Sequence, residues 1–230
     1  MEGFLFGAPG DQIRTPGSTK IFRENNKRSY PNVQERVVTL IADPFVSDAA
    51  IVIFIGGCLD RYSQIVSSYR KSFRLQNPHH TTFCFEHDQP EEIISAVITA
   101  KTGTVVTSIS LIGHSWGAIT AIKVANGLAE KGIIVDQVIT IDPVARRRIS
   151  VGSSSTRWIN VNAAPAISNG WNGDYYATLG GKWGDWPRDK ATVHYWAPCH
   201  HNEFASLVEY VSVHGKCALD CLTGSSTAES

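Results

Sequence analysis

The chain has 230 residues, of which 43% are hydrophobic and 18% are charged, a composition that permits a sizeable core and excludes wholesale disorder. Its 21 Lys and Arg residues balance 21 Asp and Glu residues, so no net field draws it towards nucleic acid or an anionic membrane. Because a domain usually holds about 100–200 residues, we expect a single domain over residues 1–230.

No stretch reaches the roughly 18–20 apolar residues that cross a bilayer. The first residues, with Glu2 and no Lys or Arg before Arg14, do not resemble a secretory signal. We therefore expect a cytoplasmic protein by default, with export by a signal-independent route left open. The five Cys are irregularly spaced and predict neither a zinc knuckle nor a disulfide framework, although a bridge between Cys217 and Cys221 is left open.

After an arm at 1–32 that is rich in Gly, Pro, Asn and charge, strand and helix patterns alternate along the chain. Apolar, β-rich runs predict strands at 33–42, 51–55, 81–86, 107–112, 135–141, 158–161 and 192–196. The predicted helices begin at Asp60, Pro90, Gly117 (ended by Gly132) and Phe204, and the last is followed by a tail at 214–230. This alternation predicts an α/β fold with a mostly parallel central sheet, helices on both faces and ligands beyond the carboxyl ends of the strands.

Ser115 is the candidate nucleophile. It stands in Gly113-His114-Ser115-Trp116-Gly117, a G-x-S-x-G directly after the predicted strand at 107–112 and before a helix of small and apolar residues. A sharp strand-to-helix turn strains its central residue, so the neighbours two positions away must lack bulk. The alternative is a Gly-flanked Ser in an ordinary turn that starts a helix.

The motif in this setting resembles the nucleophile elbow of the α/β-hydrolase superfamily, and the order of elements is similar to that fold over residues 33–213. The run at 138–143, which ends in Asp142 and Pro143, resembles lipases that place the acid after the strand following the elbow helix. The resemblance implies a serine hydrolase in which the nucleophile, the acid and the base follow in that order along the chain.

Asp142 is the candidate acid, because it stands at the end of the predicted strand at 135–141, on the site side of the sheet. There its carboxylate could hold an imidazole in one tautomer. It could instead simply cap a loop. Asp174, Asp185 and Asp189 in the later loop are alternatives.

His201 is the candidate base. His201-Asn202-Glu203-Phe204 looks like the His-x-x-Phe that opens the last helix in several lipase-like proteins. His200 is the main alternative, and His194 lies within the strand before it. Cys199, His200 and His201 with His194 invite a zinc hypothesis, but a fourth ligand at normal spacing is missing, so we expect neither a metal nor an organic cofactor.

Two backbone N–H groups are needed to hold the oxyanion. The N–H of Trp116 is the first candidate, because Trp116 follows the nucleophile. The second is that of Cys58 or Leu59, since Gly56 and Gly57 after the predicted strand at 51–55 let the backbone approach closely. Gly-Gly before a helix is also a common turn.

Five of the six Trp fall within 158–196, mostly in a Gly- and Asn-rich segment. We expect a lid-like loop at 162–191 over the site, in which Trp171, Trp183 and Trp186, together with His114 of the motif, contact the substrate. The alternative is that these Trp residues fill the edge of the core.

Arg146, Arg147 and Arg148 follow the candidate acid. They could meet a phosphate or carboxylate on a substrate. The alternative is a solvated start of a helix.

Taken together, these residues predict a serine hydrolase of carboxylic esters with lipid-like substrates, such as a lipase, phospholipase or carboxylesterase, with peripheral lipid contact possible. A thioesterase or acyltransferase using the same triad is an alternative, as is a non-catalytic binding protein on a hydrolase fold. Bacterial lipase-like toxins that are delivered by contact-dependent secretion also resemble this architecture, so a role as a secreted effector is left open.

Overall fold

The computed structural model describes residues 49–103, 106–167, 173–210, 212–213 and 216–217. The predicted arm at 1–32, the predicted strand at 33–42 and Trp171 lie outside these residues, as does most of the predicted tail at 214–230. Within that tail, β8 (Lys216–Cys217) pairs antiparallel with β7 (Ser212–Val213).

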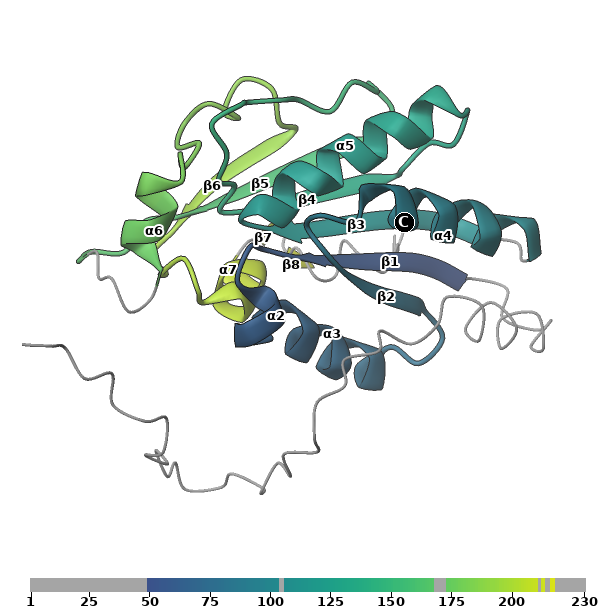
Figure 1. The fold of residues 1–230 in the computed structure, drawn as a ribbon, viewed down its shortest axis with the longest axis horizontal. Coiled ribbons are helices and arrows are strands. Elements are labelled where there is room, and N and C mark those ends of the chain that lie inside the picture. Colours follow the sequence, from purple (N-terminus) through teal and green to yellow (C-terminus); the bar gives the residue numbers. More distant parts are fainter. Residues whose placement is uncertain (1–48, 104–105, 168–172, 211, 214–215, 218–230) are drawn as a thin grey trace, which may run out of the picture.

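Six strands form one central sheet in which every neighbouring pair runs parallel. They are β1 (Ala49–Gly56), β2 (Thr81–Glu86), β3 (Val106–His114), β4 (Gln137–Ile141), β5 (Arg157–Ala163) and β6 (Val193–Ala197). Their order across the sheet is β2-β1-β3-β4-β5-β6 (Figure 1). The predicted α/β fold with a parallel sheet is confirmed, and each predicted strand within the described residues overlaps an observed one.

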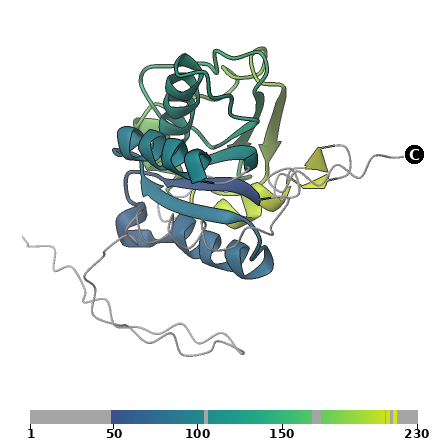
Figure 2. The same cartoon turned by 90° about the vertical axis from the view of Figure 1, so that its right-hand side faces the viewer.

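Helices cover both faces of this sheet. The helices of the described residues are α2 (Asp60–Ser63), α3 (Ile65–Gln76), α4 (Pro90–Gly103), α5 (Trp116–Glu130), α6 (Asp174–Leu179) and α7 (Phe204–Tyr210). Helices α4 and α5 pack on one face, and α3 and α7 pack on the other (Figures 1 and 2). Because both faces are covered, the strands read as continuous apolar runs in the sequence.

Strand β1 contributes to two separate hydrophobic cores. Ile51, Ile53 and Ile55 belong to the core under α4 and α5, whereas Val52 and Phe54 belong to the core under α3 and α7. Successive side chains of a strand point to opposite faces, so one apolar run serves both cores. Burial on both sides fixes the position of the carboxyl end of β1, where the site begins.

The strand order places a crevice between the carboxyl ends of β1 and β3. The chain passes from β1 to β2 on one side, and then returns beyond β1 to β3 on the other side. The connections that leave the two strands therefore lie on opposite faces, and such a switch point is where open parallel sheets bind ligands. The loop that starts at Gly57 and the turn that holds Ser115 both open into this crevice.

The helix expected from Asp60 is divided into α2 and α3. Gln64 adopts a left-handed conformation between them, with a φ of 56°. The Asp60 carboxylate accepts a hydrogen bond from the N–H of Val66 at 2.9 Å, so it caps α3 rather than α2, the helix it belongs to. No Gly or Pro marks this break in the sequence.

The segment at 162–191 is not the continuous loop that the sequence predicted. Its first residues, Asn162 and Ala163, complete β5, and its middle forms α6. Helix α6 lies at the carboxyl ends of the strands, beside the start of α5 (Figure 1). A helix of six residues is too short to show a helical period in the sequence.

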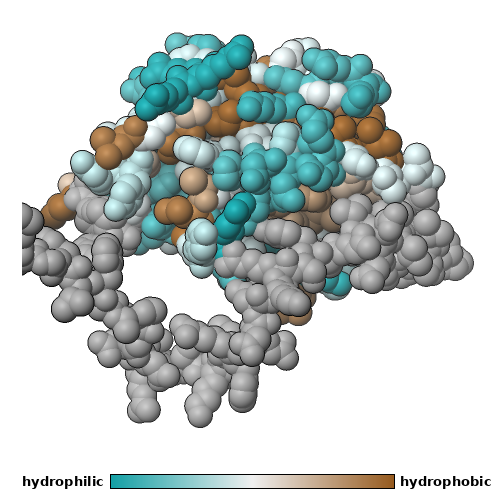
Figure 3. All heavy atoms as spheres, viewed as in Figure 1, coloured by the Kyte–Doolittle hydropathy of each residue, from teal (hydrophilic) through white to brown (hydrophobic). Residues whose placement is uncertain are grey.

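The face of the molecule seen in Figure 3 carries hydrophobic residues as separate areas with hydrophilic residues between them. Helices that bury one apolar stripe and expose the rest present such a mixture to water. In the part of the chain that the structure describes, no helix has both the length and the apolar character to cross a membrane.

Helix α5 ends in a turn that depends on Gly132. Its φ of 73° lies in the left-handed region. The N–H groups of Gly132 and Ile133 donate to the carbonyl oxygens of Ala129 and Leu128, each at 2.9 Å. These two bonds form a Schellman motif, so the predicted end of this helix is confirmed.

We expect Gly132→Ala to lower the free energy of unfolding by about 1 kcal/mol, because an L side chain is strained at this φ. No heavy atom lies within 4 Å of the position its Cβ would take, so a clash adds nothing. Lys131→Ala is the matched control, since Lys131 has an ordinary φ of −94°. Urea denaturation measures both variants, and equal losses in the two would contradict this account.

Candidate active site

Ser115 occupies the turn from β3 to α5 in a strained conformation, with φ 55° and ψ −119°. A Cβ on Gly113 would overlap the carbonyl oxygen of Gly117, and a Cβ on Gly117 would overlap the carbonyl oxygen of Ile55. Glycine is therefore required on both sides of the serine. The N–H of Ser115 donates to the carbonyl oxygen of Ile141 at 2.9 Å, which ties the turn to the end of β4.

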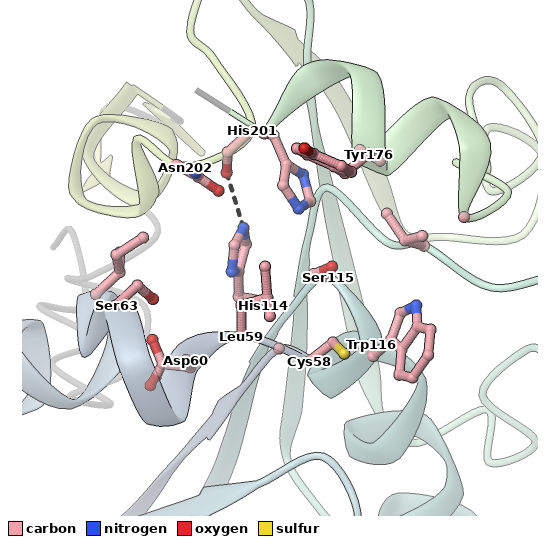
Figure 4. Close-up of a pocket in the computed structure, with 16 residues that line it drawn as sticks. Cys58, Leu59, Asp60, Ser63, His114, Ser115, Trp116, Tyr176, His201 and Asn202 are labelled. Carbon is pink, nitrogen blue, oxygen red and sulfur yellow. Dashed lines mark hydrogen bonds between the residues drawn. The ribbon is translucent and has the colours of Figure 1, made fainter. Parts of the chain in front are cut away.

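Asp142 follows β4 and is fully buried, and His201 stands in the loop before α7. The Oδ2 atom of Asp142 and the Nδ1 atom of His201 are 2.7 Å apart. An ionised carboxylate can only accept, so Nδ1 carries the proton and Nε2 is left as an acceptor. Both His201 and Ser115 line one cavity, and the imidazole extends towards Ser115 (Figure 4).

Lys182 supports the buried carboxylate of Asp142. Its Nζ atom is 3.0 Å from Oδ1 of Asp142 and donates to the carbonyl oxygen of Ala163 at 2.7 Å. The N–H of Ala163 donates to the same Oδ1 atom at 2.9 Å. Burial raises the pKa of Asp142, but the hydrogen bond from His201 and the charge of Lys182 outweigh it, so the pKa lies below its ordinary value of 3.8. Asp142 is therefore ionised at neutral pH.

His114, which the sequence predicted as a substrate contact, lines the cavity but is buried. Its Nε2 atom is 2.8 Å from the carbonyl oxygen of His201, which can only accept, so Nε2 donates. The two imidazole rings are 4.7 Å apart between centroids. Burial and the neighbouring His201 lower the pKa of His114 to about 3. His114 is thus neutral at pH 7 and holds the backbone of the loop that carries His201.

Asp174 and His200 form a second pair beside the first. Oδ2 of Asp174 is 2.6 Å from Nδ1 of His200, and Oδ1 of Asp174 accepts the N–H of His201 at 2.9 Å. Asp174 therefore fixes the loop of His201 through its backbone, and the ring of His200 is directed to Asp174. Of the two adjacent histidines, the structure pairs His201 with Asp142.

The remaining alternatives lie elsewhere. Asp185 is exposed, and its Oδ1 atom is 2.6 Å from Arg188 and 3.0 Å from the indole nitrogen of Trp196. His194 on β6 lies beside Asn160 on β5, with 3.1 Å between Nδ1 and Nδ2. Asp189 is exposed. The structure gives none of these residues a contact with His201.

The backbone groups expected to hold an oxyanion border the same cavity. Trp116 opens α5, so its N–H has no partner within the helix. Cys58 and Leu59 line the cavity together with Ser115 and Trp116, and their N–H groups donate no hydrogen bond within the described residues. A Cβ on Gly57 would stand 2.9 Å from the Cβ of Ser115, so its absence allows this close approach.

The cavity at Ser115 has a volume of about 390 Å³. The loop after β1, the turn after β3, helix α6 and the loop before α7 form its walls (Figure 4). Leu59, Trp116 and Tyr176 line it and also expose much of their surface to solvent. An opening with apolar sides therefore leads to the serine.

The structure places Trp183 and Trp186 away from this cavity, so they do not form the walls that the sequence predicted. Trp183 is 1% exposed, lies in the core with Trp158, and donates from Nε1 to the carbonyl oxygen of Ala145 at 3.1 Å. Trp186 packs against the same core, 4.8 Å from Trp183 between ring centroids. A buried indole whose N–H has an acceptor is a stable core residue, which is the alternative that the sequence left open.

Two residues of the site were not singled out from the sequence. Lys182 reaches Asp142 because the backbone at Lys182 forms an isolated antiparallel bridge with Val144, two residues after the acid. Tyr176 reaches the cavity from α6. Neither residue belongs to a local motif, so only the tertiary structure shows its place.

Among the described residues, no group of three or more His, Cys, Asp or Glu side chains is arranged to hold a metal ion. Cys58, Cys84 and Cys199 form no disulfide within the described residues, whereas Cys221 and the side chain of Cys217 lie outside them. The three arginines at 146–148 do not start a helix. They lie exposed in an irregular segment after β4.

We expect the buried neutral His114 to make stability depend on pH. Its pKa is about 3 when folded and near 6.5 when unfolded, so the unfolded chain binds the additional proton and stability falls as the pH falls below 6.5. The slope is at most about 1.4 kcal/mol per pH unit. His114→Gln keeps an N–H donor for the carbonyl oxygen of His201 but removes this titration. The change of the unfolding free energy with pH should therefore become smaller, by up to that slope, between about pH 6 and pH 4.

His80→Gln provides the comparison, since burial also lowers the pKa of His80, to about 4, far from the site. Its effect should add to that of His114→Gln in the double variant, because the two residues share no contact. Urea denaturation at several pH values measures the slopes. An unchanged slope in His114→Gln would show that His114 is not held neutral by the fold.

No protein-family model and no curated protein matches this chain. The RedJ thioesterase of the prodiginine pathway from Streptomyces coelicolor is similar in structure, with 11% identity over 88% of this chain and 97% of that one and a TM-score of 0.44. Est1E from Butyrivibrio proteoclasticus, with ferulic acid bound, is 12% identical over 78% and 90% of the two chains, with a TM-score of 0.43. Likenesses this distant concern the fold alone, and these solved structures are esterases and thioesterases of the α/β-hydrolase fold.

Proposed function

We propose that this protein is a serine hydrolase that cleaves carboxylic esters, with Ser115 as nucleophile, His201 as base and Asp142 as the acid that orients the base. The observation that carries the proposal is the 2.7 Å contact between Asp142 and Nδ1 of a histidine that shares a cavity with a strained serine. A serine hydroxyl is a poor nucleophile unless a base removes its proton. Nε2 of His201 is the available base in this cavity.

In the first half of the reaction, Oγ of Ser115 attacks the ester carbonyl carbon while Nε2 of His201 takes the hydroxyl proton. The resulting imidazolium donates to Asp142 through Nδ1 and is stabilised by its negative charge. The tetrahedral intermediate then collapses, the bond to the leaving oxygen breaks, and Nε2 returns its proton to that oxygen. The alcohol leaves, and the acyl group stays on Ser115.

In the second half, water replaces the alcohol. Nε2 of His201 takes a proton from water, whose oxygen attacks the acyl carbon, and the same proton then returns to Oγ of Ser115 as the acid departs. In both halves the carbonyl oxygen becomes negative. The N–H groups of Trp116 and of Cys58 or Leu59 stabilise that charge, and removal of one such donor typically costs about 10²–10³-fold in rate.

The neutral state of His114 matters for this cycle. When His201 becomes an imidazolium, a second charged ring at 4.7 Å would disfavour it. Because the pKa of His114 is about 3, that repulsion is absent at neutral pH. His114 thus supports the base by holding its backbone carbonyl and by adding no charge.

For the substrate, we propose a lipid-like ester. The apolar surfaces of Leu59, Trp116 and Tyr176, which are exposed and line the cavity, suit an acyl chain or an aromatic ring. A thioester would pass through the same steps, and an acyltransferase would differ only in the acceptor that replaces water. Hydrolysis of paired oxygen esters and thioesters, with and without an added alcohol, separates these activities.

A fluorophosphonate probe should add one phosphonyl group to the wild-type protein at Ser115, and Ser115→Ala should remain unlabelled. Intact-mass spectrometry followed by peptide mapping measures this. Labelling that persists in Ser115→Ala, or a wild-type protein that does not label, would contradict the proposal.

Matched histidine variants test the identity of the base. His201→Gln should lower kcat for 4-nitrophenyl butyrate by roughly 10⁴-fold or more, because the serine loses its base. His200→Gln should cost about tenfold or less, since it removes only one hydrogen bond to Asp174. Circular dichroism checks that both variants fold. The reverse order of effects would assign the base to His200.

A further inference from the structure

A second cavity adjoins the one at Ser115. Its volume is about 480 Å³, compared with about 390 Å³ for the first. Both cavities are lined by Trp116, Val144 and Gly180. The two cavities therefore adjoin at Trp116, the residue that follows Ser115 in the sequence.

One face of α5 forms a wall of this second cavity. Trp116, Ile119, Thr120 and Lys123 all line it, and residues three, four and seven apart lie along one side of a helix. At a rise of 1.5 Å per residue, Lys123 lies roughly 10 Å along the helix from Trp116. The wall thus runs from an apolar end beside the nucleophile to a cationic end two turns away.

The segment after β4 and the end of α6 add side chains of the same two kinds to the lining. Val144, Ala145 and Leu179 are apolar, and Arg146 stands next to them in the cavity lining. Leu179 is largely exposed, so a ligand that covered it would remove apolar surface from water. The lining therefore offers apolar contact together with two positive charges, of which Lys123 stands about two helical turns from Trp116.

Among the described residues, the two cations of this cavity have no carboxylate partner. Lys123 and Arg146 form no ion pair in the described part of the chain, and no Asp or Glu is among the described residues that line the cavity. By contrast, Lys182 is paired with Asp142 and Arg188 with Asp185. Unpaired cations beside an apolar surface are complementary to a ligand anion, which takes up charge-assisted hydrogen bonds from both.

We propose that this second cavity binds one limb of the ester substrate, and that this limb carries a carboxylate or phosphate at the end of an apolar spacer. The inference rests on the proposed function, since it assumes that the ester carbonyl sits at Ser115. Of the three arginines at 146–148, only Arg146 lines the cavity, so it alone meets the anion.

Paired substrates show whether the anionic limb belongs to the acid or to the alcohol. The acid pair is the mono-4-nitrophenyl ester of suberic acid against 4-nitrophenyl octanoate. The alcohol pair is 8-acetoxyoctyl phosphate against octyl acetate. In one of the two pairs, we expect kcat/KM to be about tenfold or more higher for the anionic member. Hydrogen bonds to a charged group contribute enough binding free energy for a difference of this size.

Charge reversal then tests the two cations. Lys123→Glu with Arg146→Glu should lower kcat/KM of the preferred anionic substrate by about tenfold or more, and change that of its neutral partner less than about twofold. Lys131→Glu and Arg148→Glu are the matched controls, because both residues are exposed on the same segments and neither lines the cavity. Equal losses for the charged and neutral substrates, or no preference in either pair, would overturn the proposal.

A binding experiment separates this proposal from the catalytic one. Calorimetric titration of Ser115→Ala with hexyl phosphate and with hexanoate needs no turnover. We expect the better of the two ligands to bind about tenfold or more weakly when Lys123→Glu and Arg146→Glu are added. Unchanged affinity for both ligands would overturn the second cavity as an anion site, whether or not the protein hydrolyses esters. Failure to label Ser115 with normal anion binding would overturn the catalytic proposal, and with it the ester limb, but would leave the second cavity as an anion site.

Discussion

The site depends on keeping the carboxylate of Asp142 charged where water does not reach it. Burial of an unpaired carboxylate would cost several kcal/mol. Three groups compensate: the N–H of Ala163, the ammonium of Lys182 and Nδ1 of His201. They come from the end of β5, the segment after α6 and the loop before α7, so one carboxylate joins parts that lie far apart in the sequence. The hydrogen bond that the buried carboxylate of Asp142 requires thus also sets the position of the His201 ring.

The strained turn at Ser115 is tied to the same point of the sheet. Its N–H donates to Ile141, the residue just before Asp142, and its carbonyl oxygen accepts the N–H of Val144, two residues after Asp142. Asp142 itself has a positive φ of 42°, so both turns hold a non-glycine residue in a sparsely populated conformation. Such strain persists where surrounding contacts fix the backbone, and here the buried strands β3 and β4 provide them.

The sequence alone predicted the features whose signal lies within a short stretch of the chain. Apolar runs identified the strands, and the glycines around Ser115 identified its turn, because both signals lie in neighbouring residues. The choice between His200 and His201 stayed open, since it depends on which ring meets Asp142 and which meets Asp174. The contact of Lys182 with Asp142 could not be predicted for the same reason, since it also joins residues that lie far apart in the sequence. The prediction for Trp183 and Trp186 was wrong because composition does not show which face of a segment turns inward: Trp183 fills the core, while Tyr176 lines the cavity.

A crystal structure of the protein after reaction with a fluorophosphonate tests the central claim most directly, since the phosphonyl group imitates the tetrahedral intermediate. We predict phosphorus bonded to Oγ of Ser115. Its oxygen should lie about 2.7–3.1 Å from the N–H of Trp116 and from that of Cys58 or Leu59. Nδ1 of His201 should still donate to Asp142. Phosphorus on any other residue, or an oxygen that faces away from these N–H groups, would contradict the account.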